Sequence, residues 1–433
     1  KVMDFVASGT LPNGKAVVLK SNGQVEVVAE TSSQGYVIPY GNDEIFSTSA
    51  IYISVAFDPN AANVFVVAWK GGSSNYGMAA VGTVSGSSIS FGSAVVFNAG
   101  ASNDNSIAFD PNTTNKFVIV YVDDSNGAYA TAVVGTRSGT SVSFGSETVF
   151  SSTNCLNTNI AFDPNTANKF VATFKNRTGA NAGTAIVGTV SGSGISFGGA
   201  TVYETSNTKS QNIAFDPSNS GKFAISYNTS VGKCIIGTRS GTTLSFGSAV
   251  TFNSSSNTDV KVAFDPNTAN KLVTSYVDSG NSSFGTAIVG TMSGTSVSFG
   301  TAVVFNSDTV SYSTVAFDPN TANRLVIAYS DGGNSSFGTA IVGTVSGTSI
   351  SYSSKYVIAG SSYTDISISF DPNTSGNFVT TYKSSGGKAI LSDLTGTVAT
   401  TNLTSTNFVG IASKAISNTA TGPITLQGGI STN

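Results

Sequence analysis

The chain has no histidine, two cysteines and few charged residues, and each shortage excludes a kind of chemistry. Without histidine there can be no Ser-His-Asp triad, no imidazole general base and no imidazole metal ligand. Cys155 and Cys234 are too few for a zinc-thiolate cluster or a disulfide scaffold. We interpret both as small buried hydrophobic residues, and a disulfide between them is the alternative.

Charge is scarce as well. The 433 residues include 20 lysines and arginines and 23 aspartates and glutamates, so 10% of the chain is charged, where soluble domains carry roughly 25%. The cations are too few for the basic field that nucleic acids require, and we expect no nucleic-acid partner. Apolar runs are too short for a membrane span. The start at Lys1 lacks both methionine and a signal-peptide core, which indicates a processed or trimmed end.

The chain is built from one motif in seven copies. The tripeptide Phe-Asp-Pro recurs at intervals of 49 to 53 residues. Its aspartates are Asp58, Asp110, Asp163, Asp216, Asp265, Asp318 and Asp371. Proline presets the backbone of a turn and the aspartate bonds nearby amides, so we interpret these residues as turn caps. Calcium needs several carboxylates and each turn offers one, so we expect no metal site.

Each repeat contains four short segments of strand character. In the repeat around Asp110 they are 106–109, 116–122, 131–136 and 141–144, all rich in β-branched and aromatic residues. No window has a useful helical period. Four strands in each of seven repeats predict an all-β fold, a seven-bladed β-propeller with four-stranded blades.

The seventh repeat lacks its last strand, and the other end of the chain supplies a candidate. Residues 41–47 match 145–151 in spacing and residue type. We therefore expect residues 36–47 to be the outer strand of the seventh blade, which closes the propeller of residues 36–398. Residues 1–35 and 399–433 are predicted to lie outside it, close together, as a small β subdomain.

Binding residues are expected on one face of the propeller. The Asp-Pro-Asn turns of one face are nearly constant, whereas the loops of the opposite face vary in length and content, and recognition usually resides in such loops. The alternative is that these loops are solvated and have no function. The candidate ligand-binding residues are Tyr312, Tyr363, Asp123, Asp124, Asp278 and Asp331.

No catalytic residues are predicted. The adjacent acids Asp43-Glu44 and Asp123-Asp124 face opposite sides of an extended chain, so neither pair forms a glycosidase dyad. Glycine-rich phosphate-binding motifs that lead into a helix are absent. We therefore expect a protein that is not an enzyme and binds no cofactor.

The repeats carry a family resemblance. The segments AFDPNTANKF (161–170) and GTAIVGTVSGTSIS (338–351), with the flanking pieces 7–10 and 407–412, resemble repeat proteins of marine bacteriophages. The resemblance implies an extracellular virion structural or tail-fibre component that contacts a host-surface glycan or protein, with other virion subunits bound through the terminal segments. A secreted or surface-attached bacterial lectin or adhesin is the first alternative, and a glycan-cleaving propeller enzyme is the second.

Overall fold

The computed structural model describes residues 2–11, 16–27, 30–37, 41–72, 74–394, 396–401, 408–412, 417 and 419–426. Apart from the 3-10 turns η1 (Asp124–Asn126) and η2 (Gly332–Asn334), the regular structure of these residues is β-strand, so the all-β prediction is confirmed. Within them, no helix has the length and apolar character needed to cross a membrane. The chain divides into two compact units, residues 38–395 and residues 1–37 with 396–433.

In the larger unit, each repeat forms an antiparallel sheet whose first three strands pair in chain order. The first, innermost strands are β6 (Ala50–Phe57), β10 (Val95–Phe109), β15 (Cys155–Phe162), β20 (Lys209–Phe215), β25 (Asn257–Phe264), β29 (Val303–Phe317) and β34 (Thr364–Phe370). The second strands are β7 (Val64–Gly71), β11 (Lys116–Asp123), β16 (Lys169–Asn176), β21 (Lys222–Asn228), β26 (Lys271–Asp278), β30 (Arg324–Asp331) and β35 (Phe378–Lys383). The third strands are β8 (Tyr76–Ser85), β12 (Tyr129–Ser138), β17 (Ala182–Ser191), β22 (Gly232–Ser240), β27 (Phe284–Ser293), β31 (Phe337–Ser346) and β36 (Gly387–Ser392).

The outer edge of a repeat consists of two short strands that both pair with the third strand. The strands of the outer hairpin are β9 (Ser88–Phe91), β13 (Ser141–Phe144), β18 (Gly194–Phe197), β23 (Thr243–Phe246), β28 (Ser296–Phe299) and β32 (Ser349–Tyr352). The strands that follow them are β14 (Thr148–Ser151), β19 (Thr201–Glu204), β24 (Val250–Asn253) and β33 (Tyr356–Ser362). In two repeats this last position is the beginning of β10 or β29, which continues inward as the innermost strand of the next repeat.

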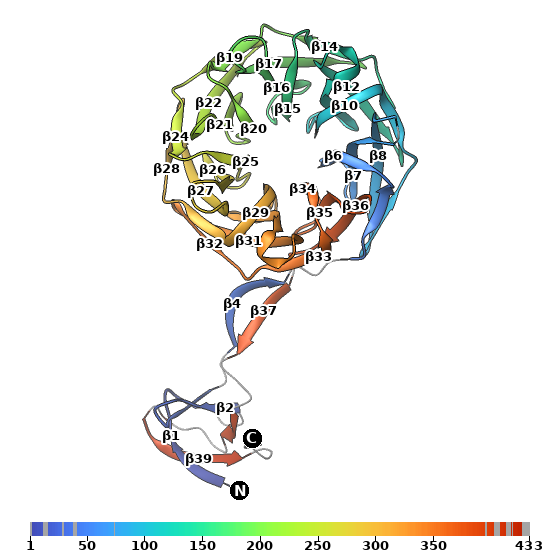
Figure 1. Ribbon diagram of the computed structural model, residues 1–433. Helices are drawn as coiled ribbons and strands as arrows, with labels where there is room; N and C mark the ends of the chain where they lie inside the picture. Colours follow the sequence, from blue (N-terminus) through green and yellow to red (C-terminus); the bar gives the residue numbers. More distant parts are fainter. Residues whose placement is uncertain are drawn as a thin grey trace. The chain divides into compact units, whose positions relative to one another are not determined.

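The repeats follow one another around an open centre, which the innermost strands face (Figure 1). Each innermost strand contacts the next in chain order, and β34 contacts β6, so the contacts form a cycle. A small residue stands two positions before each Phe-Asp-Pro aspartate, as at Ala56 and Ala108. Converging strands leave room only for small side chains, which explains this regularity.

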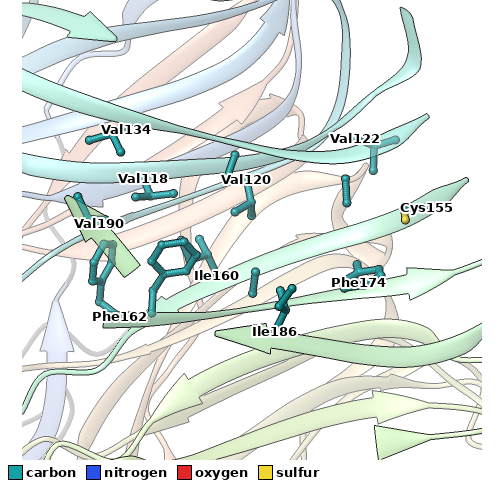
Figure 2. Packing of buried hydrophobic residues seen from close by; sticks show 14 of the residues in the cluster. Val118, Val120, Val122, Val134, Cys155, Ile160, Phe162, Phe174, Ile186 and Val190 are labelled. Atoms are coloured by element: carbon teal, nitrogen blue, oxygen red, sulfur yellow. The ribbon is translucent and has the colours of Figure 1, made fainter. Parts of the chain in front are cut away.

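The core lies between the faces of neighbouring sheets. Val118, Val120 and Val122 of β11 pack toward the next repeat, where they meet Ile160 and Phe174 (Figure 2). Alternate residues of β11 face opposite sides, so its other apolar residues join the cluster shared with the preceding repeat. Strand β11 is therefore apolar on both faces, and its unbroken hydrophobic run over residues 117–122 reflects this.

The last sheet of the ring is completed by the N-terminal side of the chain. Strand β5 (Glu44–Ser47) pairs with β36, with Ile45 opposite Lys388 and Ser47 opposite Gly387. The strand is shorter than the predicted segment 36–47. The reason is that residues 36 and 37 end a different strand, β4 (Glu30–Val37), which pairs with β37 (Gly396–Thr401) in the other unit.

The smaller unit joins the two ends of the chain. Its sheet has the order β1-β39-β38-β2-β3 and comprises β1 (Val2–Val6), β39 (Thr421–Leu426), β38 (Phe408–Ala412), β2 (Ala16–Leu19) and β3 (Val25–Val27). An Asn22-Gly23 turn connects β2 to β3, as its sequence predicts. Buried Leu11, Val17 and Ile424 form part of its core. The similar Asn13-Gly14 pair lies outside the described residues.

Both cysteines are buried and free. Cys155 begins β15 and Cys234 lies in β22, in different sheets. Burial raises the pKa of the Cys234 thiol to about 12. The interpretation of both residues as buried hydrophobes is confirmed, and the disulfide alternative is wrong.

Candidate functional site

Every innermost strand has a β-bulge six residues before the Phe-Asp-Pro aspartate. In the first repeat, Ile51 pairs with Lys70 and Ser54 with Ala68, so two residues of β6 lie opposite one residue of β7. The bulged Tyr52 has a φ of 53°, a left-handed conformation that is rare for a large side chain. The bulge residues of the seven repeats, all with positive φ, are Tyr52, Asp104, Asn157, Ser210, Asp259, Tyr312 and Asp365.

The bulge residues line a cavity of about 290 Å³ at the centre of the ring, referred to below as the axial cavity. All seven innermost strands contribute to its wall. A regular strand turns alternate side chains to one side, whereas a bulge redirects them. Consecutive residues such as Tyr52 with Ile53 and Asp104 with Asn105 therefore both line the cavity.

Three of the bulge residues are aspartates that link neighbouring repeats. Each accepts a hydrogen bond from the backbone N–H of the next bulge residue around the ring. The donor–acceptor pairs are Tyr52 N to Asp365 Oδ1 at 3.1 Å, Asn157 N to Asp104 Oδ2 at 2.6 Å, and Tyr312 N to Asp259 Oδ2 at 2.6 Å. These bonds hold the carboxylates at the wall of the cavity.

Burial makes two of these carboxylates easier to protonate. It raises the pKa of both Asp104 and Asp259 above the ordinary value, because water solvates a carboxylate better than the cavity wall does. The backbone N–H bonds oppose this shift without cancelling it. Lys70 lowers the pKa of Asp104 and Lys261 lowers that of Asp259, in each case against the effect of burial.

Lys261 brings a positive charge to the same wall. It lies four residues before its Phe-Asp-Pro aspartate, at a position that other repeats fill with small polar residues. Two of those, Ser54 and Asn212, accept backbone N–H bonds from the next repeat at 3.2 and 2.9 Å. In the described part of the chain, the Lys261 ammonium group has no such bond and no ion pair. Burial lowers its pKa, and the charge of Asp259 opposes this.

Two tyrosines complete the cavity wall. The side chains of Tyr52 and Tyr312 are 36% and 44% exposed. Burial and nearby aspartates raise the pKa of both phenols, so they remain neutral hydrogen-bond donors at physiological pH. Lys70 Nζ lies 5.9 Å from the centre of the Tyr52 ring and donates to Asn103 Oδ1 at 2.8 Å. The wall therefore combines carboxylate, ammonium, amide, hydroxyl and aromatic groups, a combination suited to binding a polar ligand.

The innermost strands end, on the other face of the ring, in the Phe-Asp-Pro turns, and there the same residue types line the centre in every repeat. A wide opening of about 490 Å³ is lined there by the phenylalanine and proline of every Phe-Asp-Pro turn. Asp110 illustrates the turn: its Oδ1 accepts from Asn112 N at 2.9 Å and its Oδ2 from Asn168 N, in the next repeat, at 2.7 Å. At Asp58 and Asp163 an arginine forms the second contact instead. The prediction that these aspartates cap turns is confirmed.

The two tyrosines predicted to bind a ligand lie in different environments. Tyr312 lines the axial cavity. Tyr363 was expected beside it on a binding loop, but its side chain is fully buried and lies 4.0 Å from the Tyr382 ring, measured between ring centres. Tyr363 fills the core position that phenylalanine or tyrosine occupies in other repeats, so we assign it to packing.

Three of the four predicted aspartates end second strands and Asp124 follows one directly, and none of the four lines the axial cavity. Asp123 and Asp331 are buried and cap η1 and η2. Asp331 Oδ2 also lies 3.2 Å from Lys355 Nζ. Asp124 accepts from Asn103 Nδ2 at 2.6 Å, and Asp278 from Gly280 N at 3.0 Å. Their carboxylates serve local structure, and a binding role for them stays a prediction.

Sequence reasoning missed most of the cavity residues. The bulge residues could have been found from the sequence by their position. Each stands six residues before a Phe-Asp-Pro aspartate, and its residue type changes from repeat to repeat. A packing position keeps one type of residue. A position that is constant in place but variable in chemistry is typical of a surface that recognises something.

The ring of sheets and its axial cavity define a β-propeller, and the comparisons with known proteins agree. The chain is similar to a crystal structure of Sqt1 from Chaetomium thermophilum, with 12% identity and a TM-score of 0.53 over 83% of this chain and 100% of that chain. A structure of the same protein bound to the N-terminus of the ribosomal protein L10 has 14% identity and a TM-score of 0.50, over 82% and 89% of the respective chains. At such identities the likeness shows the fold alone. No protein-family model matches the chain, and no curated protein matches it significantly.

These neighbours contradict two predictions. The virion or adhesion role, with its lectin alternative, is wrong, because the solved structures that share the fold are Sqt1 propellers. The host-surface glycan and the virion subunits are wrong as partners, because the bound partner among these structures is a segment of a ribosomal protein. Low charge and short polar repeats reflect the propeller scaffold and carry no information about where the protein acts.

Proposed function

We propose that the chain is a non-enzymatic, seven-bladed β-propeller that binds a segment of a partner protein over its axial cavity. The observation that carries the proposal is the contrast between the two ends of the channel. One end repeats the same phenylalanine and proline in every repeat, whereas the other presents four residue types at its seven bulge positions. Such diversity on a rigid scaffold suits recognition.

Contacts between the first and last repeats support seven blades. Asn63 N donates to Asp371 Oδ2 at 2.7 Å, and Phe57 N donates to Ser369 Oγ at 3.1 Å. Other repeat pairs make the Asn63–Asp371 type of bond, for example Asn168 to Asp110. The first and last repeats therefore meet as neighbouring repeats do elsewhere in the ring, and β5 fills the outer position of the seventh.

The chemistry of the cavity supports binding rather than catalysis. The chain has no histidine. The carboxylates of Asp104, Asp259 and Asp365 accept backbone N–H bonds that anchor neighbouring repeats. A general acid or base must be free to exchange its proton with a substrate, which these structural bonds restrict.

The form of the cavity supports a protein segment as the ligand. Its mouth is surrounded by the loops that vary between repeats, and its wall offers hydrogen-bonding groups together with two exposed tyrosines. Tyrosine is frequent among the residues that dominate protein interfaces. The Sqt1 structure with the N-terminus of L10 is a precedent for a propeller of similar fold that binds a protein segment.

Selection from a displayed library of random peptides tests the proposal. Peptides enriched on the immobilised full chain are then titrated by calorimetry against wild type, Tyr312→Ser and Val202→Thr. Serine occupies the equivalent bulge position at Ser210, so Tyr312→Ser leaves the backbone geometry intact. Val202, 51% exposed on β19, is the control because it does not line the cavity.

We expect Tyr312→Ser to weaken binding about tenfold or more, as for an interface hot spot, and Val202→Thr to leave it unchanged. Failure to enrich any peptide, or equal affinity for all three proteins, would overturn the assignment of the cavity. Mass spectrometry of the peptides after incubation tests the absence of enzymatic cleavage.

A further inference from the structure

The charge of the chain is unevenly distributed. Residues 151–253, which comprise most of two repeats, contain seven basic residues and three acidic ones. The rest of the chain has thirteen basic and twenty acidic residues. A basic sector within an acidic chain is a candidate for an electrostatic contact with a partner.

The acidic residues of this sector are already engaged. Asp163 forms an ion pair with Arg239 at 2.5 Å. Glu204 lies 2.9 Å from Lys233 Nζ and also accepts bonds from Tyr227 Oη and Ser206 N. Asp216 accepts from the backbone and side chain of its own turn. None of the three carboxylates is left for the remaining cations.

Three cations remain together on the face of the axial cavity: Lys175, Arg177 and Lys209. No ion pair joins any of them to a carboxylate in the part of the chain that the structure describes. Arg177 Nη1 donates to the neutral Asn154 Oδ1 at 3.0 Å. Burial lowers the pKa of Lys175, and the charges of Lys209 and Arg177 lower it further. The positive charges of Lys209 and Arg177 therefore repel that of Lys175, and a bound anion would offset this repulsion.

A cavity adjoins this cluster. About 350 Å³ of space lies beside Lys209, between the loops that lead into β20 and β22, and hydroxyl groups of Ser206, Thr229 and Ser230 line it. Lys209 immediately precedes the bulge residue Ser210, and Lys175 pairs with Leu156, which immediately precedes Asn157. Cluster and cavity are thus on the face that bears the axial cavity.

We propose that Lys175, Arg177 and Lys209, with the adjoining hydroxyl-lined cavity, bind carboxylate side chains of the same partner segment. The proposal rests on the proposed function, because it supplies a second contact beside the axial cavity. Ammonium, guanidinium and hydroxyl groups donate to carboxylates, and such charge-assisted bonds are about twice as strong as neutral ones. A protein segment fits better than a nucleic acid, since the nearby Tyr203 and Tyr227 are buried and leave no platform for base stacking.

Fluorescence anisotropy with a labelled oligoglutamate peptide tests this site in the full chain at low ionic strength. Lys175→Gln/Lys209→Gln removes two cations from the cluster. Its matched control is Lys169→Gln/Lys222→Gln, which removes equal charge from the opposite ends of β16 and β21, where each lysine donates to a threonine. A single-stranded oligonucleotide of similar charge serves as the competing probe.

We expect the cluster variant to bind oligoglutamate about tenfold more weakly and the control to bind like wild type, with affinity that falls as salt rises. Equal losses in both variants, absence of binding, or preference for the oligonucleotide would overturn the proposal. The library-selected peptides and Tyr312→Ser report on the axial cavity independently. If oligoglutamate does not bind at the basic cluster while selected peptides still bind at the axial cavity, only the proposal for the cluster is rejected. If neither experiment shows binding, both proposals are rejected.

Discussion

The backbone N–H of Tyr52 donates to Asp365 Oδ1 at 3.1 Å, although 313 positions of the chain separate the two residues. Tyr52 belongs to the first repeat and Asp365 to the last. The same bond joins Asn157 to Asp104 and Tyr312 to Asp259, between repeats that are consecutive in the chain. One interaction thus builds the wall of the axial cavity and connects the first repeat with the last, so the geometry of the cavity and the closure of the ring depend on each other.

Phe46→Ala is expected to destabilise the protein by weakening the last sheet. The Phe46 ring lies 5.0 Å from Trp69 and 5.5 Å from Phe91, measured between ring centres, and thereby fastens β5 to the first repeat. Removal of a packed phenylalanine costs about 3–5 kcal/mol when fully buried, and somewhat less is expected at this partly buried position. Ile45→Ala on the same strand is the control, because Ile45 is 57% exposed. Similar unfolding free energies for the two variants in urea would contradict a closing role for β5.

Gly188→Ala is expected to destabilise the third repeat. A methyl group at Gly188 in β17 would overlap the ring of Phe170 on β16. Overpacking of this kind costs about 1–3 kcal/mol. Gly199→Ala in the same repeat serves as the control, because no atom lies within 4 Å of its added carbon. Thermal unfolding should show a lower Tm for Gly188→Ala but not for Gly199→Ala. An unchanged Tm for Gly188→Ala would mean that the Phe170 ring can move to make room for the methyl group.

The Glu204–Lys233 pair is expected to stabilise the protein in a defined pH range. Burial alone would raise the pKa of Glu204, but hydrogen bonds from Lys233 and Ser206 outweigh it and lower the pKa from 4.5 to about 2. A carboxylate with a lowered pKa in the folded state stabilises that state above its unfolded pKa. This contribution is lost as the pH falls from about 4.5 toward about 2.

Glu204→Gln should therefore reduce the unfolding free energy at pH 7, and the difference from wild type should shrink near pH 2. Urea titrations at both values measure it. Glu44→Gln, at an exposed position of β5, controls for the loss of one negative charge. A difference between wild type and Glu204→Gln that is the same at both pH values would show that the effect of the substitution does not depend on ionisation.

Both cysteines are expected to be protected in the native protein and reactive after unfolding. Cys155 and Cys234 are buried and free, and only the thiolate reacts readily with an aromatic disulfide reagent. Without reductant, the native chain should release almost no thiolate product, and the chain unfolded in guanidinium should release two equivalents. Fast reaction in the native state would contradict the burial of these residues, and a shortfall after unfolding would indicate a disulfide.

Much of the architecture was predictable because the repeat makes the sequence redundant. The strands predicted at 106–109, 116–122, 131–136 and 141–144 lie within β10, β11, β12 and β13. An aromatic residue, such as Trp69 or Tyr382, stands eleven positions after each Phe-Asp-Pro aspartate, and it is buried in every repeat. A residue that departs from the strand pattern in one repeat is outweighed by the residues at the same position in the other six, so the strands can be assigned despite local exceptions.

The candidate site was harder to predict. Loops vary in sequence, and that variation directed attention to Asp123, Asp124, Asp278 and Asp331, whose carboxylates turn out to serve local structure. Apart from Tyr312, the bulge residues were not predicted, because a bulge leaves no strong local pattern in the sequence. In a regular strand, consecutive residues such as Tyr52 and Ile53 face opposite sides, whereas the bulge brings both to one cavity.

The sequence by itself determined the strands, the turns and the sevenfold repeat, since these depend on residues close together in the chain. Only the tertiary structure decided which distant side chains share one space. Tyr52, Asp104, Asp259, Lys261 and Tyr312 meet at one cavity because the ring brings the innermost strands together at its centre. The basic cluster of Lys175, Arg177 and Lys209 likewise exists because two repeats become neighbours. Ionic and hydrogen-bonding interactions act over a few ångströms of space, so their partners are fixed by the closure of the ring and not by distance along the chain.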